Sequence, residues 1–432
     1  MQDNEKRFPQ IKPLMNSSEA YYESSRCLFC YNAPCTIACP TSIDIPLFIR
    51  QINNGNLTGA GKTIYDSNYL GNTCAKVCPT EVLCEGACVF TKVNIKALAI
   101  GRLQNFATNN AILTKQKYFE IPNPNGKSVA IIGAGPAGIS CACELRKAGY
   151  QVDIFEAKSN PSGLALHGVA PYKITNREAL MEVEYLREQF GFNIIYNTRI
   201  ANIEDVQKLE TKYDAVFLGI GLGNSAEIKI NGEDKPECIG ATEFIEQIKM
   251  NPSEEPIARK VIVLGGGNTA MDAASECARL GAEKVIVAYR RSEKEMKAYY
   301  FEYDLAKVTG VTGMFNIAPI EIVGGNNVEG VKFIRTEHVD GKLRNIQGSE
   351  FVLDCDLVIK ATGQMKQKSL IANISGITMD ETGRILVNET SGQTSNPKYF
   401  AGGDAVNGGA EVVNATAEGK IAGIGIHLFL SR

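Results

Sequence analysis

Eight of the thirteen cysteines in this 432-residue chain lie between residues 27 and 88, at the short spacing of metal ligands. One group reads Cys-x2-Cys-x4-Cys-x3-Cys-Pro from residue 27, and a second reads Cys-x3-Cys-Pro-x4-Cys-x3-Cys from residue 74. The eight residues are Cys27, Cys30, Cys35, Cys39, Cys74, Cys78, Cys84 and Cys88. Thiolates spaced in this way bind iron–sulfur clusters or zinc.

The two Cys-Pro pairs favour iron–sulfur clusters, because a proline also closes the cysteine runs of bacterial ferredoxins. Zinc and unliganded structural thiols are the alternatives. Eight thiolates would hold two 4Fe–4S clusters with four ligands each. Since the last cysteine of a run can bind the other cluster, Cys39 can join the second group and Cys88 the first. The five remaining cysteines have no metal-like spacing and are interpreted as buried packing thiols.

A glycine-rich turn follows the expected strand 129–132 and predicts a dinucleotide site. The turn has the form Gly-x-Gly-x-x-Gly, and it leads through a helical pattern to a second strand that ends in an acid. The glycines allow a tight turn, backbone approach to a pyrophosphate and close helix packing, and the acid can bind ribose hydroxyls. The candidate residues are Gly133, Gly135, Pro136, Ala137, Gly138 and Glu156.

A second turn of this kind follows the expected strand 261–264. Gly265, Gly267 and Ala270 take the three small positions. The next strand ends in Arg290 and Arg291, where an acid normally stands. Arginine suits a 2′-phosphate, so the sequence favours NADPH over NADH at this second site.

Three later segments complete the pattern. Strands run into glycines at 215–223 and at 357–363, where the latter ends in Ala361, Thr362 and Gly363. Near the end of the chain, Gly403 and Asp404 follow a strand and precede a helix, and an aspartate there can bind a polyol hydroxyl. This order predicts FAD in the first site and a nicotinamide in the second, with hydride passing from nicotinamide to flavin.

The elements that position these residues predict an α/β protein. We expect an N-terminal α-helical iron–sulfur domain over 1–124, with amphipathic helices between Cys39 and Cys74. Two Rossmann-like domains follow, the second inserted in the first. The FAD-binding domain would comprise 125–228 and 366–432, and the NAD(P)-binding domain 229–365.

Composition narrows the function classes. Apolar residues make up 44%, charged residues 22%, and the net charge is −3, as in ordinary globular proteins. The chain has no Lys/Arg block that would indicate nucleic acid and no run of apolar residues long enough for a membrane span. The N-terminal sequence does not resemble a secretory signal, so we expect a cytoplasmic protein.

Three segments together resemble the cluster domain of dihydropyrimidine dehydrogenase and, less closely, the small subunit of glutamate synthase. They are CLFCYNAPCTIACPTSIDIPLFIRQINNGN at 27–56, CAKVCPTEVLCEGAC at 74–88 and IGRLQNF at 100–106. The resemblance covers roughly residues 20 to 430. The eukaryotic enzyme carries extra FMN and pyrimidine-reducing domains, whereas this chain stops after the FAD domain closes. It therefore resembles the separate flavin/iron–sulfur subunit of the bacterial NAD-dependent enzyme.

The resemblance implies specific ligands. One cluster would take Cys27, Cys30, Cys35 and Cys88; the other would take Cys39, Cys78, Cys84 and Gln104, with Cys74 unliganded. The flavin residues that it adds are Leu164, Lys173, Ile200, Gly403, Asp404, Glu411, Val412 and Val413. The implied nicotinamide residues are Gly267, Asn268, Thr269, Arg290, Arg291 and Lys297. The sequence departs from the family at Ser162, where the family has glycine, and family members differ in using NADH or NADPH.

The resemblance also implies a reaction sequence. NAD(P)H would reduce FAD, and single electrons would then pass to the Gln104-containing cluster, to the all-cysteine cluster and to a partner. That partner would be an FMN-containing subunit of a hetero-oligomer, which reduces uracil or thymine. Another acceptor, chiefly the glutamate-producing subunit of glutamate synthase, is the alternative. No catalytic acid or base is assigned to this chain.

Overall fold

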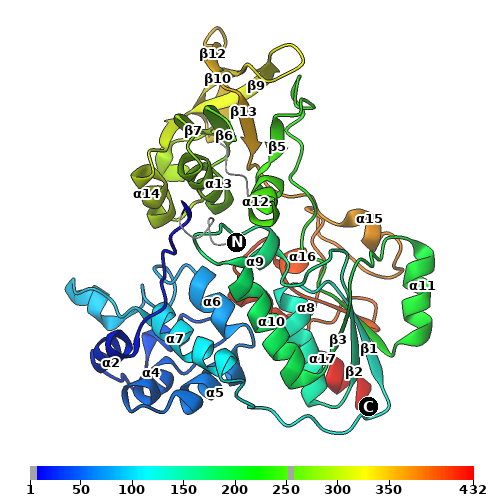
Figure 1. Ribbon diagram of the computed structural model, residues 1–432. Coiled ribbons are helices and arrows are strands. Elements are labelled where there is room, and N and C mark those ends of the chain that lie inside the picture. Colours follow the sequence, from blue (N-terminus) through cyan, green and yellow to red (C-terminus); the bar gives the residue numbers. More distant parts are fainter. Residues whose placement is uncertain (1–6, 252–256) are drawn as a thin grey trace. The chain divides into compact units, whose positions relative to one another are not determined.

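The computed structural model describes residues 7–251 and 257–432, which form two compact units (Figure 1). The larger unit contains Ile11–Leu166, Lys173–Leu222 and Lys366–Arg432. The smaller unit contains Gly223–Met365 and His167–Tyr172, with the described residues up to Gln10. The predicted α/β class is confirmed. Within the described residues, no helix combines the length and apolar character that a membrane span requires.

The N-terminal part of the larger unit is helical. Its elements are α2 (Ser17–Ser25), α3 (Pro34–Ile37), α4 (Ile45–Asn53), α5 (Leu57–Ser67), α6 (Gly71–Val77), the 3₁₀ helix η1 (Val89–Val93) and α7 (Ile100–Leu113). Helix α4 is amphipathic, because Ile45, Phe48, Ile49 and Ile52 recur at helical spacing and are all buried. They pack with Leu103 and Ala107 of α7 in one apolar core, which holds the cysteine-bearing loops in place.

A five-stranded parallel sheet forms the rest of the larger unit, in the order β14-β4-β1-β2-β3. The strands are β1 (Ser128–Ile132), β2 (Gln151–Phe155), β3 (Asn193–Ile195), β4 (Ala215–Leu218) and β14 (Tyr399–Ala401). Strand β14 pairs with β4 although Gly223–Met365, the main segment of the smaller unit, lies between them in sequence. The helices are α8 (Pro136–Lys147), α9 (Leu164–His167), α10 (Asn176–Phe190), α11 (Ile203–Lys212), α15 (Lys368–Ile371), α16 (Asp404–Asn407) and α17 (Val412–Leu430).

The smaller unit repeats this design with the parallel order β5-β13-β6-β7-β8. These strands are β5 (Cys238–Gly240), β6 (Lys260–Leu264), β7 (Lys284–Tyr289), β8 (Thr312–Phe315) and β13 (Leu357–Lys360). An antiparallel group consists of β9 (Ile317–Val323), β10 (Gly330–Val339), β11 (Lys342–Asn345) and β12 (Phe351–Asp354). The helices are α12 (Ala241–Met250), α13 (Asn268–Arg279), α14 (Tyr300–Val308) and the 3₁₀ helix η2 (Glu293–Glu295).

Within the larger unit, the helical part and the sheet part share one core. Tyr65 and Tyr69, at the end of α5 and just after it, are fully buried against Phe190 of α10. Glu182 of α10 is also fully buried and accepts hydrogen bonds from the backbone N–H groups of Asn72 (2.6 Å) and Thr73 (2.7 Å). These contacts hold the cysteine-bearing helix α6 against the flavin-type sheet domain.

Candidate functional site

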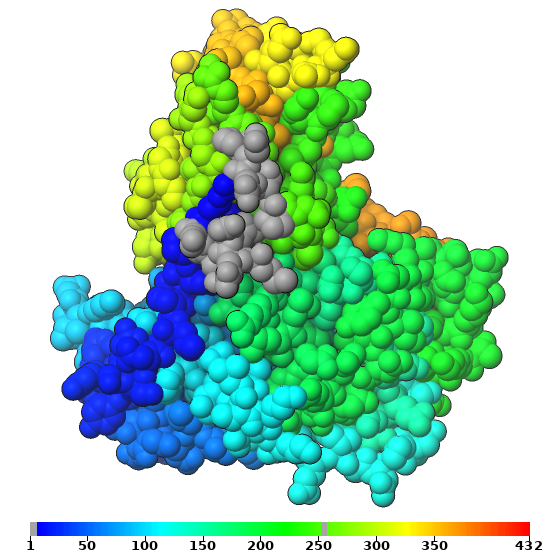
Figure 2. Space-filling view, viewed as in Figure 1, coloured from blue at the N-terminus to red at the C-terminus, as the bar shows by residue number. Residues whose placement is uncertain are grey.

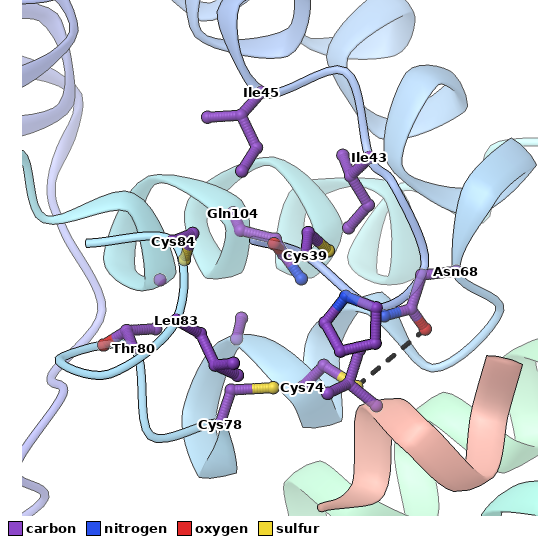
Figure 3. Close-up of a pocket in the computed structure, with 14 residues that line it drawn as sticks. Cys39, Ile43, Ile45, Asn68, Cys74, Cys78, Thr80, Leu83, Cys84 and Gln104 are labelled. Atoms are coloured by element: carbon purple, nitrogen blue, oxygen red, sulfur yellow. Dashed lines mark hydrogen bonds between the residues drawn. The ribbon is translucent and has the colours of Figure 1, made fainter. Parts of the chain in front are cut away.

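A pocket in the helical part collects residues of the second cysteine group (Figure 3). Its lining includes four thiols, Cys39, Cys74, Cys78 and Cys84, and two amides, Asn68 and Gln104. Ile43, Ile45 and Leu83 supply apolar walls. Val413, in the first turn of α17, also lines the pocket. The cavity therefore adjoins the helix whose start carries candidate flavin residues.

Gln104 lies on the buried face of α7, with 7% of its surface exposed. Its side-chain nitrogen donates a hydrogen bond to the carbonyl oxygen of Gly71 at 2.7 Å. Because this bond occupies the amide nitrogen, the amide oxygen is the atom left to act as a ligand. The orientation suits an iron atom, which takes an oxygen donor and not an amide N–H group.

Two thiols of this pocket, Cys78 and Cys84, are in an environment that opposes the free thiolate. A hydrogen bond with Cys74, together with burial, raises the pKa of the Cys78 thiol well above its ordinary value. Burial and the nearby Glu85 carboxylate raise the pKa of Cys84 in the same way. A metal cluster would supply the positive charge that stabilises thiolates in such a site.

The other four cysteines form a second neighbourhood. Burial raises the pKa of Cys27, and the adjacent thiols of Cys30 and Cys88 raise it further by repulsion. The pKa of Cys35 is raised to about 11 by burial, with added repulsion from Cys27 and Cys88. The structure thus places Cys88 with the first cysteine run and Cys39 with the second. This proximity is compatible with the crossed ligand assignment, which stays a prediction.

The first glycine turn has the geometry of a dinucleotide site. Gly133 has a φ of 101°, and a Cβ there would collide with the carbonyl of Gly219. Gly138 has no room for a Cβ either, because the carbonyl of Gly133 is in the way. At Gly135 the nearest atom to a built Cβ is 3.9 Å away, so the backbone remains open to a ligand. The Glu156 carboxylate accepts hydrogen bonds from Ala134 N and Lys158 N, each at 2.8 Å, which orients it beside the turn.

The C-terminal return segment meets this turn inside the larger unit. A Cβ built on Gly403, whose φ is 76°, would lie 3.1 Å from the Cβ of Ala137. Asp404 follows directly, and burial raises the pKa of its carboxyl. Glu411 is the N-cap of the 19-residue helix α17. The first N–H groups of this helix, at Val412 and Val413, have no partners inside the helix. Such a helix start can bind an electron-rich part of a flavin.

The remaining flavin candidates lie around the same sheet or next to it. Leu164 starts α9, and Ile200 packs against the apolar core beneath β1 and β4. Lys173 is buried, at 6% exposure. Ser162 donates its N–H to the carbonyl of Ala134 at 2.8 Å, so the 162–164 loop is joined to the first turn. Its φ of 81° is a left-handed conformation that favours the glycine of the family pattern.

The second glycine turn, in the smaller unit, repeats the arrangement. Gly265 has a φ of 149°, and a Cβ there would collide with the carbonyl of Ala361. A Cβ on Gly267 would meet open space, so the backbone is accessible before α13 begins at Asn268. The side chain of Asn268 accepts a hydrogen bond from Tyr299 N at 2.9 Å. Thr269 is in the first turn of α13, while Thr362 and Gly363 continue from Ala361 and are exposed.

Arg290, Arg291 and Lys297 form the basic side of this second site. Both arginines follow β7, and the strand's last residues pair with β6 immediately before the glycine turn. Arg290 and Lys297 are exposed, and Arg291 is half-buried. The backbone N–H of Lys297 donates to the carbonyl of Gly266 at 2.9 Å, which keeps this lysine next to the turn.

We expect the double substitution Arg290→Ala and Arg291→Ala to raise the KM for NADPH about tenfold or more, because charge-assisted hydrogen bonds to the 2′-phosphate would be lost. The KM for NADH should stay nearly unchanged. Stopped-flow reduction of the bound flavin by each nucleotide measures both. Lys284→Ala, at the exposed opposite end of β7, is the matched control. An equal loss with both nucleotides would contradict a 2′-phosphate site.

Sequence motifs did not reveal every residue around the cluster pocket. Asn68 and Glu182 belong to no recognisable pattern, although Asn68 lines the pocket and Glu182 binds the backbone of α6. By contrast, the five outlying cysteines are all buried, as predicted: Cys141, Cys143, Cys238, Cys277 and Cys355. Among the described residues, no three His, Cys, Asp or Glu side chains are arranged to hold a single metal ion.

Two family models match this chain. Residues 4–116 match a model described as dihydropyrimidine dehydrogenase domain II, 4Fe-4S cluster, and residues 127–419 match the pyridine nucleotide-disulphide oxidoreductase model. The first match decides between the iron–sulfur and zinc interpretations of the cysteines in favour of clusters. The second supports FAD and NAD(P)H as the nucleotide cofactors.

Full-length relatives share both parts. The chain is 33% identical over 441 residues to the glutamate synthase [NADPH] small chain of Escherichia coli, covering 97% of this chain and 93% of that protein. It is 32% identical over 426 residues to the NAD-dependent dihydropyrimidine dehydrogenase subunit PreT of Escherichia coli, covering 98% and 97%. These two similarities are equal in practice, so identity alone does not select an electron acceptor.

Solved structures agree with the fold. FprA from Mycobacterium tuberculosis, in complex with NADPH, aligns with a TM-score of 0.59 and 20% identity, over 72% of this chain and 85% of that one. The thioredoxin reductase of T. acidophilum aligns with a TM-score of 0.56 and 20% identity, over 71% of this chain and all of that one. Both alignments support the pair of Rossmann-type domains.

Proposed function

The chain belongs to the pyridine nucleotide-disulphide oxidoreductase family, and from that premise we propose that it supplies electrons from NAD(P)H to a separate FMN-containing subunit that reduces uracil or thymine. The chain is an oxidoreductase with FAD, 4Fe–4S clusters and NAD(P)H as cofactors. When bound, these groups supply the hydride and single-electron chemistry. The protein's task is to hold them in order and to exclude water.

One observation carries this proposal. Val413 belongs both to the first turn of α17, where the flavin candidates lie, and to the lining of the pocket that contains Cys39, Cys78, Cys84 and Gln104. The candidate flavin residues at the start of α17 therefore adjoin these cysteines within one unit, which supports the proposed order of the carriers. Apolar side chains such as Leu83 shield the space between sulfur ligands from water, which helps to set a cluster's potential.

The first cysteine group provides an exit. Near its thiols in sequence stand three exposed apolar side chains, Leu28 (62% exposed), Tyr31 (100%) and Ile37 (79%). Figure 2 shows the dark blue N-terminal segment, which precedes the first cysteine group, at the molecular surface. Exposed apolar groups beside a redox site suit docking of a partner protein. In this proposal, electrons leave the chain here.

The glutamate-producing subunit of glutamate synthase is the second candidate acceptor. The specific observation in its favour is the 33% identity to the glutamate synthase small chain over 97% of this chain. That relative is named as one chain of an enzyme that uses NADPH, and the basic pair Arg290 and Arg291 is compatible with the same nucleotide.

The test is anaerobic co-expression of the chain with each type of partner, followed by co-purification and turnover. NADH or NADPH is supplied, with uracil, thymine, or 2-oxoglutarate plus glutamine as the acceptor. We expect nucleotide oxidation coupled to uracil or thymine reduction when the FMN-containing subunit is present. Coupling only to 2-oxoglutarate and glutamine would replace the pyrimidine proposal with the glutamate one. Flavin reduction without turnover of any acceptor would contradict both.

A further inference from the structure

A buried hydrogen-bond donor lies in the wall of the pocket that contains Cys39, Cys78, Cys84 and Gln104. Asn68 is fully buried and lines the same pocket as Cys39 and Val413. Its side-chain nitrogen is shielded from solvent and has no hydrogen-bond partner among the described residues. An unsatisfied buried N–H group is destabilising, so proteins seldom keep one without a partner.

The orientation of this amide follows from its other contacts. The side-chain oxygen of Asn68 accepts a hydrogen bond from the backbone N–H of Leu70 at 2.9 Å. It also accepts from the thiol of Cys74 at 3.9 Å. A backbone N–H cannot donate to an NH2 group, so the oxygen must face Leu70 and the nitrogen must take the other position. Figure 3 shows the oxygen joined to Cys74 and the nitrogen turned toward the other lining side chains.

The pocket offers a class of acceptor that matches the unpaired donor. Its other polar lining residues are the cysteines, Thr80 and Gln104, and the side-chain nitrogen of Gln104 is already bonded to Gly71. The sulfur atoms of an iron–sulfur cluster carry negative charge and accept N–H hydrogen bonds, which are among the main determinants of cluster potential. Pro40 and Leu83 exclude water from the same space.

We propose that the Asn68 side-chain N–H donates a hydrogen bond to a sulfur atom of the cluster held in this pocket and thereby raises that cluster's reduction potential. The reduced cluster is more negative than the oxidised one, so a donor stabilises it more. Asn68 is a positioning residue that acts on potential and is not a ligand. The inference rests on the proposed assignment of Cys39, Cys78, Cys84 and Gln104 to this cluster.

Two substitutions isolate the N–H group. Asn68→Asp keeps an oxygen for Leu70 N and Cys74 but replaces the donor with a second oxygen. Asn68→Ala removes the whole amide without adding charge. Because their side effects differ, a change shared by both variants reports the lost donor. If the alanine variant does not assemble, the aspartate variant still retains the contact that caps the chain at Leu70.

The measurement is an anaerobic redox titration of the intact protein, monitored by electron paramagnetic resonance. We expect both variants to lower the equilibrium constant for reduction of the Gln104-containing cluster at least tenfold. Its reduction potential would then fall by about 59 mV or more for one electron. The all-cysteine cluster in the same sample is the internal control and should not shift. An exchangeable proton coupled to the reduced cluster should also disappear from the electron–nuclear double resonance spectrum of the variants.

The possible failures are distinguishable. Two normal cluster signals with unchanged potentials in both variants would overturn the role of Asn68 while leaving the proposed function intact. Absence of the second cluster from the unmodified protein would overturn the proposed ligand assignment itself. An upward shift in both variants would show that the amide does not act as a donor to the cluster.

Discussion

Replacing Cys84 with alanine is expected to remove one of the two clusters, so that iron content falls from about eight atoms to about four per chain. NADPH should still bleach the flavin, because neither nucleotide site includes this residue. Electron transfer to an acceptor should fall at least 100-fold, since the flavin would lose the adjoining carrier. Iron analysis, anaerobic flavin titration and acceptor reduction measure the three quantities separately.

The structure gives the reason for choosing this residue. Cys84 lines the pocket beside Cys39 and Cys78, and both of these thiols repel its charged form. Three thiolates so close together need a positively charged partner to coexist. Loss of Cys84 removes one of the four proposed ligands of this cluster.

Cys74→Ala is the matched control, because it removes a thiol from the same pocket but outside the proposed ligand set. Its thiol donates to Asn68 and shares a hydrogen bond with Cys78, so it has contacts that do not require iron. This variant should keep about eight iron atoms per chain. The assignment would be contradicted if the Cys74→Ala variant lost four iron atoms per chain while the Cys84→Ala variant kept all eight. Cys74 would then be a ligand in place of Cys84.

The sequence alone predicted the fold class and the order of the parts. The glycine turns are readable because each conformational requirement is local: Gly133 and Gly265 need positive φ values, and Gly138 needs the absence of a Cβ. The parallel strands on either side are short apolar runs with clear turn signals. A local requirement of this kind leaves a mark in the sequence wherever the fold uses it.

Several residues of the cluster pocket and its surroundings could not be predicted from sequence motifs. Counting cysteines predicts eight thiolate ligands, yet the structure brings Gln104 into the pocket. This residue lies on α7, which begins at Ile100, well after Cys88, the last cysteine of the second group. Glutamine is a common residue on helices, so its type and position carry no signal without the fold or a family resemblance. The same holds for Glu182, whose partners lie on another helix.

Glu182 is expected to make the protein less stable as the pH rises from 5 to 8. Burial raises the pKa of its carboxyl from 4.5 to about 7, although the N–H groups of Asn72 and Thr73 and the hydroxyl of Tyr65 oppose this shift. Between these two pKa values the folded state binds a proton that the unfolded state has released. This contribution is fully present below pH 4.5 and is lost as the pH passes through 7.

The size of the effect follows from the shift. A difference of about 2.5 pKa units corresponds to roughly 3 kcal/mol in the free energy of unfolding. Glu182→Gln cannot ionise, so it should remove most of this pH dependence. It should also cost about 1–3 kcal/mol at pH 5, because an amide nitrogen would face a backbone N–H donor. Glu184→Gln, on the exposed face of the same helix, is the control and should behave like the unmodified protein.

The measurement is the urea midpoint of the anaerobic protein at several pH values, followed by circular dichroism, with the slope of the transition checked at each pH. The decisive quantity is the change between pH 5 and pH 8, compared between Glu182→Gln and Glu184→Gln. Equal changes in the two variants would mean that Glu182 is ionised in the folded state throughout. The carboxylate would then be a permanent negative charge beside α6, and α6 carries the residues that lead into the cluster pocket.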